Sequence, residues 1–102
     1  MAKIDFDYQQ FDDAIHGRVR FSVMAYLSGA DEADFVELRD RVGGTDGNLL
    51  SHLRKLEEAG YVRIGKSKAS GRVRTICRMT ASGRAAWIAY IRRLEALIAA
   101  SS

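Results

Sequence analysis

Residues 45–64, TDGNLLSHLRKLEEAGYVRI, are the stretch of this 102-residue chain that decides its fold. Thr45 is a favoured residue just before a helix begins, and Gly60 is a residue at which helices end. Between them, apolar residues recur at spacings of three and four, the repeat of a helix with one buried face. These residues are Leu49, Leu50, Leu53 and Leu56. The pattern predicts a helix from about residue 46 to about Ala59 that faces the core with its leucines.

The side of this helix away from the leucines carries polar groups that suit contact with DNA. At 100° per residue, four of them gather there: Asn48, Ser51, His52 and Lys55. An amide, a hydroxyl, an imidazole and an ammonium group can all hydrogen-bond to base edges or phosphates, and no acid lies among them. A solvated helix face without a partner carries similar residues. Arg54, at the edge of this cluster, suits either a phosphate contact or an ion pair with Glu58.

A shorter helix precedes this one. An apolar stripe predicts it over residues 35–42. Asp34 is placed to cap its start, and Glu37, three residues on, completes a capping-box pattern. Gly43 and Gly44 then break the chain tightly before the next helix begins. Two helices joined in this way predict a helix-turn-helix.

Two strands joined by a basic turn follow. The alternation over residues 61–64 and 72–79 predicts a β-hairpin. Four of its cations are candidates for contact with phosphates or with a narrow minor groove: Lys66, Lys68, Arg72 and Arg74. A solvated loop that never touches DNA is the alternative. On the second strand, Val73, Thr75, Cys77 and Met79 share one face, which predicts that Cys77 is a buried thiol with a structural role.

Charge is divided unevenly along the chain, although the formal net charge is only +3. Residues 1–40 hold four Lys or Arg against nine Asp or Glu, a net of −5. Residues 51–78 hold eight against two, a net of +6. A concentrated positive segment attracts a polyanion, and phosphate neutralisation with counterion release is the main source of non-specific DNA affinity.

Apolar patterns near the two ends predict further helices, over about residues 10–27 and about residues 81–99. Thr80 is placed to cap the later one. The apolar surface of this last helix is too wide to be buried within so small a domain, which predicts that a second subunit covers it. The expected dimer interface comprises Phe11, Trp87, Tyr90, Ile91, Leu94 and Ile98. The alternative for Trp87 and Tyr90 is to line a small-molecule pocket at that interface.

Several classes of protein are disfavoured. The length predicts a single domain over residues 1–102. There is no apolar run long enough to span a membrane and no apolar signal segment, so we expect a cytoplasmic protein without a membrane partner. The histidines and the single cysteine lack metal-ligand spacing. Ser51 and His52 are adjacent on a helix and point apart, so they form no nucleophile–base pair. We therefore expect neither an enzyme nor a cofactor.

These segments resemble the winged helix-turn-helix transcriptional regulators, in particular the short single-domain type related to the MarR-like repressors. The resemblance covers roughly residues 15–100 and is most specific from Asn48 to Val62. It continues through Gly71-Arg72, Arg74-Thr75 and Met79-Thr80-x-x-Gly83-Arg84. Met79 replaces the leucine usual in this family, which is a conservative change. The resemblance implies that the third helix enters the major groove, that the hairpin touches the flanking backbone or minor groove, and that the first and last helices build a two-fold dimer.

The expected fold is therefore α+β and mostly α: a winged helix-turn-helix with a two-stranded β-hairpin wing and a C-terminal dimerisation helix. The expected function is sequence-specific binding of double-stranded DNA by a homodimeric transcriptional repressor, on a pseudo-palindromic operator. Two alternatives stay open at this point. One is a winged-helix module that binds an acidic protein partner, and the other is a sensor whose DNA affinity changes with a small ligand.

Overall fold

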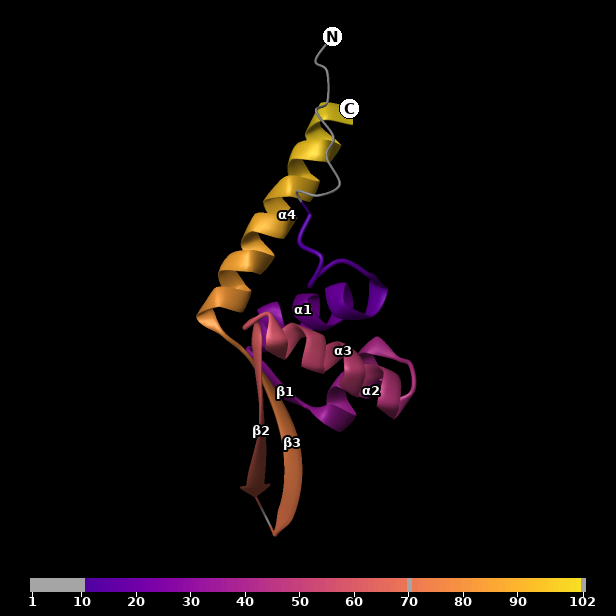
Figure 1. Cartoon of the computed structure of the whole chain (residues 1–102), viewed down its shortest axis with the longest axis vertical. Helices are drawn as coiled ribbons and strands as arrows, with labels where there is room; N and C mark the ends of the chain where they lie inside the picture. Colours follow the sequence, from indigo (N-terminus) through magenta and orange to yellow (C-terminus); the bar gives the residue numbers. More distant parts are fainter. Residues whose placement is uncertain (1–10, 70, 102) are drawn as a thin grey trace.

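The computed structural model describes residues 11–69 and 71–101 (Figure 1). Its elements follow the chain in the order α1 (Arg18–Ala30), β1 (Glu32–Asp34), α2 (Phe35–Val42), α3 (Asp46–Glu58), β2 (Val62–Ala69), β3 (Arg72–Met79) and α4 (Ala81–Ser101). Helices α1, α2 and α3 form the body of the domain. Helix α4 and the β2–β3 hairpin, called the wing below, project from opposite ends of this body.

The core is formed where α1, α2 and α3 pack against the root of the sheet. Leu49, Leu53 and Leu56 of α3 are at most 1% exposed, as their spacing predicts. They join buried apolar side chains from the other segments: Ile15, Val23, Met24, Leu27, Leu38, Val62 and Cys77. Full burial of each leucine contributes about 1.5–3 kcal/mol, so α3 is held firmly by one face. The architecture confirms the predicted winged helix-turn-helix of the α+β, mostly α class.

The helix-turn-helix forms at the predicted positions. Asp34 caps α2, because its Oδ1 accepts a hydrogen bond from the backbone N–H of Glu37 at 2.8 Å. The side chain of Glu37 accepts from the hydroxyl of Tyr26, which joins α2 to α1. Gly43 and Gly44 take φ values of 83° and 95°, which favour glycine, so the chain turns sharply between α2 and α3.

The first helix differs from the prediction of about residues 10–27. It begins only after Gly17 and continues past the predicted end; Gln10 lies outside the described residues. Gly17 has φ 114° and ψ 148°, a conformation through which no helix can continue. Before it, residues 13–15 form a turn in which the N–H of Ile15 donates to the carbonyl of Asp12 at 3.1 Å. Ile15 is still fully buried, so the apolar spacing located a core contact but not the helix start.

The predicted two-stranded hairpin is present as β2 and β3, and a third strand, β1, which was not predicted, joins the same sheet. Strand β1 pairs antiparallel with β3, and the sheet order is β1-β3-β2. Ala33 in its middle is 4% exposed and lies opposite Cys77. A strand of three residues is too short to show an alternating pattern, and it exists because the root of β3 offers it backbone partners.

Helix α4 starts where predicted and is fixed to the start of β2. The hydroxyl of Thr80 donates to the carbonyl of Gly60 at 2.6 Å and accepts from the N–H of Gly83 at 2.9 Å. The N–H of Thr80 donates to the carbonyl of Tyr61 at 3.0 Å. Arg84, one residue further, donates to the carbonyl of Ser28 at the end of α1. The helix then runs to Ser101, past the predicted end near residue 99.

Candidate nucleic-acid interface

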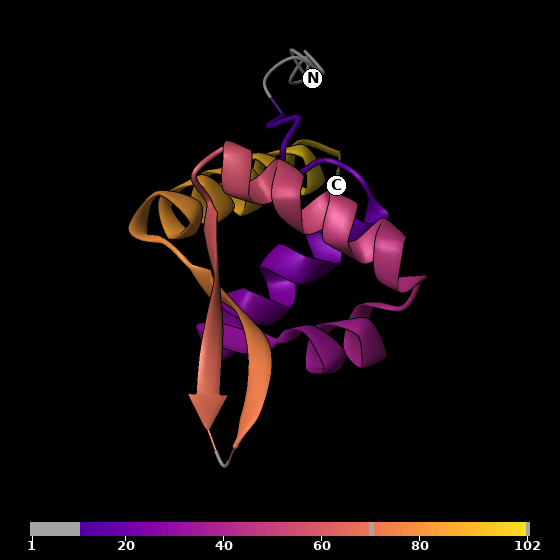
Figure 2. The same ribbon diagram turned by 60° about the horizontal axis from the view of Figure 1, so that its bottom comes forward.

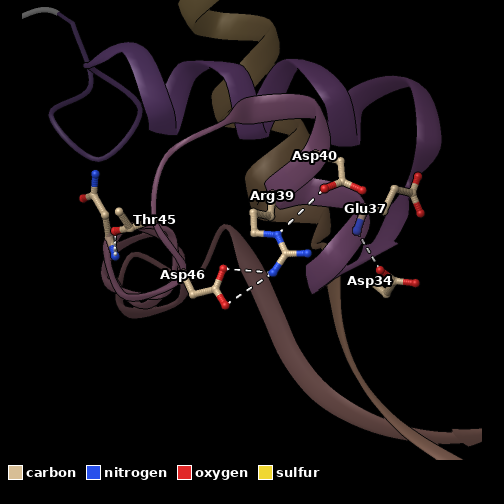
Figure 3. A network of polar contacts seen from close by, with 7 residues as sticks. Asp34, Glu37, Arg39, Asp40, Thr45 and Asp46 are labelled. Carbon is tan, nitrogen blue, oxygen red and sulfur yellow. Dashed lines mark hydrogen bonds and ion pairs between the residues drawn. The ribbon is translucent and has the colours of Figure 1, made fainter.

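The turn between α2 and α3 fixes where α3 begins (Figure 3). The hydroxyl of Thr45 accepts from the N–H of Asn48 at 3.2 Å. Arg39 of α2 donates to Asp46 in the first turn of α3 at 3.1 Å, and its Nε lies 3.8 Å from Asp40. Exposed ion pairs of this kind contribute only about 0–1 kcal/mol. The effect of the Arg39–Asp46 pair is geometric, because it ties the first turn of α3 to α2.

The outer face of α3 carries three of the predicted contact residues. Asn48, Ser51 and Lys55 are all exposed, opposite the buried leucines. Within residues 11–69 and 71–101, their side chains make no hydrogen bond or ion pair with the rest of the chain. In Figure 2, α3 crosses the near side of the body with no other element in front of it. These donors and acceptors are therefore free to meet an outside partner.

Two predicted contact residues lie at the margins of that face. His52 is half-buried, so less of its imidazole is available to a partner than of its neighbours. Arg54 is exposed on the flank of α3 that faces the wing, and the described part of the chain shows no ion pair between it and Glu58. Leu50, predicted to face the core, is only half-buried and lies on this same flank.

A groove of about 490 Å³ separates α3 from the wing. Arg54 and Glu57 line it from α3, and Ile64 and Lys66 line it from β2. The carboxylate of Glu57 accepts from the N–H of Ile64 at 3.1 Å, so the last turn of α3 is tied to the root of the wing. The helix and the wing therefore border one continuous surface.

The wing extends well beyond the body (Figures 1 and 2). Its strands pair over eight residues each, from Val62 opposite Met79 to Ala69 opposite Arg72. Val73 has the predicted register on the face of Cys77, yet it is 66% exposed while Cys77 is 1% exposed. The difference arises because the sheet faces the body only at its root.

The four predicted wing cations divide between two faces. Lys66 lies opposite Thr75 and Lys68 opposite Val73, so the two lysines share the face that borders the groove beside α3. The hydrogen bond from Lys66 Nζ to the Thr75 hydroxyl, 2.8 Å long, agrees with this register. Because side chains alternate along a strand, Arg72 and Arg74 project from the opposite face. From the sequence, these four cations were predicted as one group of DNA contacts. The pairing register places two of them on each face of the wing.

Some of these cations have internal partners and others do not. Arg74 donates to Asp34 at 3.4 Å, an ion pair between the wing and the start of α2. In the part of the chain that the structure describes, no hydrogen bond or ion pair engages Arg54, Lys55, Lys68 or Arg72. Arg54, Lys55 and Lys68 are thus cations without an internal partner in the described residues on the side of the molecule that holds α3 and the groove, and their charge suits this side to a polyanion. Arg72 projects from the opposite face of the wing.

Two contacts near the wing and α3 were not predicted from the sequence. Asp34 was expected only as a helix cap, but its second oxygen also holds Arg74, forty residues later. The partners meet because β1 pairs with β3, and β1 was not predicted. The pair between Arg39 and Asp46 was also missed. The only sign of this pair in the sequence was a positive residue before the two-glycine turn and a negative residue after it.

The buried thiol of Cys77 and the possible metal ligands bear on two other kinds of site. Burial, with a smaller contribution from the charge of Glu57, raises the pKa of the Cys77 thiol to about 12, so the thiol stays protonated and unreactive. Among the described residues, no three His, Cys, Asp or Glu side chains lie close enough together to hold a metal ion. Within the same ranges, no helix combines the length and apolar character needed to cross a membrane.

Most of the predicted dimer residues pack within their own subunit. Tyr90 of α4 is only 8% exposed and meets Phe11 edge-on, with ring centres 5.5 Å apart. Trp87 packs on Phe21 with ring centres 5.1 Å apart, a partner that the sequence analysis did not identify. Ile98 further along α4 is 70% exposed. Half-buried Ile91 and Leu94 lie between these two regions of the helix.

Sequence comparison finds proteins related to this chain. The winged helix DNA-binding domain family matches the chain over residues 19–98. An uncharacterized protein of Methanocaldococcus jannaschii is 45% identical over 73 residues, which cover 72% of this chain and 79% of that protein.

Solved structures share the fold. The transcriptional regulator homologue of Pyrococcus horikoshii OT3 is similar with a TM-score of 0.81 at 30% identity, over 88% of this chain and 90% of that one. A protein of Enterococcus faecalis V583, described as a regulator of the MarR family, has a TM-score of 0.73 at 22% identity, over 93% and 89% of the two chains. At that lower identity the likeness concerns the fold alone.

Proposed function

Since this chain belongs to the winged helix DNA-binding domain family, we propose that it regulates transcription by binding a specific duplex sequence as a homodimer. The observation that carries the proposal is the outer face of α3. Asn48, Ser51 and Lys55 are exposed there and have no partner within the described residues. A helix of this size fits the major groove, where an asparagine amide can form two hydrogen bonds to adenine.

The wing supports the same proposal. Lys68 and Arg72 project near its tip without internal partners in the described part of the chain, and Arg54 lies between the wing and the outer face of α3. Cations beside a helix that reads bases supply the phosphate contacts that set its register on the duplex. The helix would then provide sequence preference and the wing most of the sequence-independent affinity.

The homodimer is proposed from the apolar residues of α4. Ile88 is 44% exposed and Ile98 is 70% exposed on the helix that projects from the body. Apolar side chains on a projecting helix favour association with a second copy. A two-fold dimer would place two α3 helices about 34 Å apart, one duplex turn, and would favour a pseudo-palindromic operator. Occupation of such a site within a promoter would repress transcription by blocking the polymerase.

Selection of bound duplexes from a random library, followed by sequencing, tests the proposal. We expect an enriched motif with two related half-sites about one turn apart. Affinity for the enriched duplex should fall steeply with salt, with a slope near −0.9 for each phosphate neutralised. Absence of duplex binding at low salt would contradict DNA binding altogether. Binding with no enriched motif would contradict base reading by α3.

A further inference from the structure

Strand β3 has an open edge along the outer half of the wing. At the root of the wing this edge is paired with β1, from Glu32 opposite Arg78 to Asp34 opposite Ile76. The chain then turns away into α2, so among the described residues no strand pairs with this edge over residues 72–75. An exposed strand edge is a template for pairing with another chain.

The ladder shows which backbone groups are unpaired at this edge. The N–H of Met79 donates to the carbonyl of Asp31, just before β1, at 2.9 Å. Every second residue of an antiparallel strand turns its N–H and C=O to the same side, so Thr75 and Val73 turn theirs to the open edge. Their backbone donors and acceptors are therefore available to an added strand.

A groove of about 840 Å³ lies beside the open edge. Residues 72–75 of β3 form one wall and residues of α2 form the other. Val73 on the first wall is 66% exposed, and Val36 on the second is 53% exposed. Exposed apolar side chains on both walls favour a partner that brings an apolar residue into the groove.

The charges along the edge favour an acidic strand. Arg72 makes no hydrogen bond or ion pair within the described residues, and the side chain of Arg74 stays 53% exposed beside Asp34. Antiparallel pairing of two such edges from two copies would set Arg74 opposite Arg72 or opposite the second Arg74. Like charges directly opposite are destabilising, so the edge is suited to a strand with acids two residues apart.

Strand β1 shows which sequence this edge of β3 accepts. It reads Glu32-Ala33-Asp34, an apolar residue between two acids. Glu32 pairs with Arg78 at 3.2 Å. Asp34 pairs with Arg74 at 3.4 Å, and Ala33 between the two acids is 4% exposed.

The same order of an acid, an apolar residue and an acid occurs at one other place in the sequence, Asp5-Phe6-Asp7. This segment lies outside the described residues. We propose that residues 5–7 of a second copy add to the open edge as a strand, in continuation of β1, with the two acids facing Arg72 and Arg74. Phe6 then lies opposite Val73 whether the added strand runs parallel or antiparallel to β3, because the two acids flank it evenly.

A second copy is needed because the segment cannot reach its own wing. Phe11 packs against Tyr90 of α4, with ring centres 5.5 Å apart. Helix α4 and the wing project from opposite ends of the body (Figure 1). The chain from Asp7 to Phe11 spans at most about 14 Å when fully extended, which is too short to pass the three-helix body.

Disulfide formation between two full-length copies tests the arrangement. One copy carries Phe6→Cys, and the other, with a larger tag, carries Val73→Cys. Cys77 stays in both, because it is 1% exposed. Under mild oxidation by glutathione disulfide, paired strands bring the two new thiols within disulfide range.

We expect the mixed disulfide to form at least about tenfold faster with Val73→Cys than with Ser67→Cys as the second variant. Ser67 is the matched control, since it is also exposed near the tip of the wing but lies on β2. Equal rates with the two variants would mean that Phe6 does not reach the open edge, and would overturn the inference.

Other occupants of the edge give different products. A disulfide that forms faster between two Val73→Cys copies than the mixed one would mean that two wings pair with each other. A chain with both Phe6→Cys and Val73→Cys that closes its disulfide internally faster than between molecules would mean that the segment reaches its own wing. Either result would overturn the inference.

Exchange of charges tests the ion pairs. Arg72→Glu in the Val73→Cys copy should slow the mixed disulfide by about threefold to tenfold, because an acid then meets an acid. In the other copy, Asp7→Arg should restore the rate if the added strand is antiparallel to β3, and Asp5→Arg if it is parallel. Arg63→Glu, exposed at the root of the wing, should leave the rate unchanged. Rescue by neither arginine variant would overturn the pairing.

These experiments contain no DNA, so they are independent of the proposed function. A protein that binds duplex DNA but forms no mixed disulfide would keep the proposed function and lose this inference. A protein that forms the mixed disulfide but binds no duplex would do the reverse.

Discussion

A β-carbon placed on Gly83 would lie 2.0 Å from the carbonyl oxygen of Tyr61. That oxygen also accepts the N–H of Thr80, so it cannot move without breaking the bond that seats α4 on the root of the wing. Glycine weakens a helix interior by roughly 0.5–1 kcal/mol relative to alanine, so helix propensity does not explain a glycine at this position. The close approach to Tyr61 explains it, because no larger residue fits there.

Gly83→Ala should destabilise the protein by about 1–3 kcal/mol, the usual cost of overpacking a tight contact. Gly29→Ala is the control, since Gly29 is also helical but a β-carbon there meets nothing within 4 Å. That change should be neutral or stabilising by about 0.4–1 kcal/mol. Urea unfolding of both variants measures the difference. Equal stability of the two variants would contradict the close approach of Gly83 to Tyr61.

Asp34→Asn should strengthen DNA binding without weakening the fold. Asparagine caps a helix about as well as aspartate, so the bond to the N–H of Glu37 at 2.8 Å can persist. Loss of the carboxylate charge releases Arg74, which should raise the magnitude of the salt slope by up to about 0.9. Fluorescence anisotropy over a salt series measures this slope.

Asp34→Ala provides the contrast for that experiment. It also releases Arg74, but it removes the cap of α2 and should cost about 1 kcal/mol of stability. An Asn variant with an unchanged salt slope would mean that Arg74 does not reach DNA even when it is free.

Asn48→Ala should reduce discrimination between the selected duplex and a scrambled one by about 1–3 kcal/mol, because an exposed amide on α3 is placed to read a base. Lys68→Ala should instead weaken binding to both duplexes by the same factor, because a phosphate contact carries no sequence information. Competition binding with the two duplexes measures the ratio. An even loss from Asn48→Ala would argue against base contact by this residue.

Ile98→Asn should weaken dimerisation at least about tenfold, since burial of an isoleucine contributes about 1.5–3 kcal/mol. Ala96→Asn is the control: Ala96 is exposed on the opposite side of α4 and lies two residues away. Sedimentation velocity over a concentration series measures the shift from dimer to monomer. A wild-type protein that stays monomeric at every concentration would remove the basis for a two-fold operator.

Stability should fall as pH rises above about 9. Burial raises the pKa of the Cys77 thiol from 9.0 to about 12, so between these values the unfolded thiol ionises while the folded one does not. The thiol's contribution to the free energy of unfolding is complete at pH values below the pKa it has in the unfolded chain. This contribution is lost as the pH rises through the pKa of the thiol in the folded protein. Tyr61, whose pKa is raised to about 12 by its hydrogen bond to Asp12, adds to the loss above pH 10.

Urea unfolding at about pH 8 and about pH 10.5 measures this loss. Cys77→Ala should show a smaller decrease between the two pH values than wild type, with the part due to Tyr61 retained. If stability decreased equally in both proteins, the pKa of the Cys77 thiol would be the same in the folded and unfolded states, which would contradict the prediction.

Local chemistry made the helix-turn-helix predictable. Asp34, Thr45 and Thr80 each mark a helix start by a side-chain cap that lies within three residues of its partner. The leucines of α3 carry the period of a buried helix face, and Gly43 and Gly44 permit the turn. Each of these signals depends only on neighbours along the chain, so the sequence contains them in full. The same is true of the polar outer face of α3.

The start of α1 was predicted wrongly because the apolar spacing continued across a break in the helix. The spacing of Phe11 and Ile15 matched a helix, and both side chains do pack on the body of the protein. The backbone conformation of Gly17 separates them from α1, and a glycine in a sequence permits both helical and non-helical values of φ. Apolar spacing reports which side chains are buried and does not by itself report the backbone path between them.

Unaided, the sequence determined the positions of the caps, the buried and polar faces of α3, and the presence of a basic hairpin, because interactions between near neighbours fix each of them. Only the tertiary structure decided the pairing of β1 with β3, the bond between Asp34 and Arg74, and the division of Lys68 and Arg72 between two faces of the wing. Those relationships join residues distant in the chain or depend on strand register, and backbone hydrogen bonds and core packing set both only when the whole domain has folded.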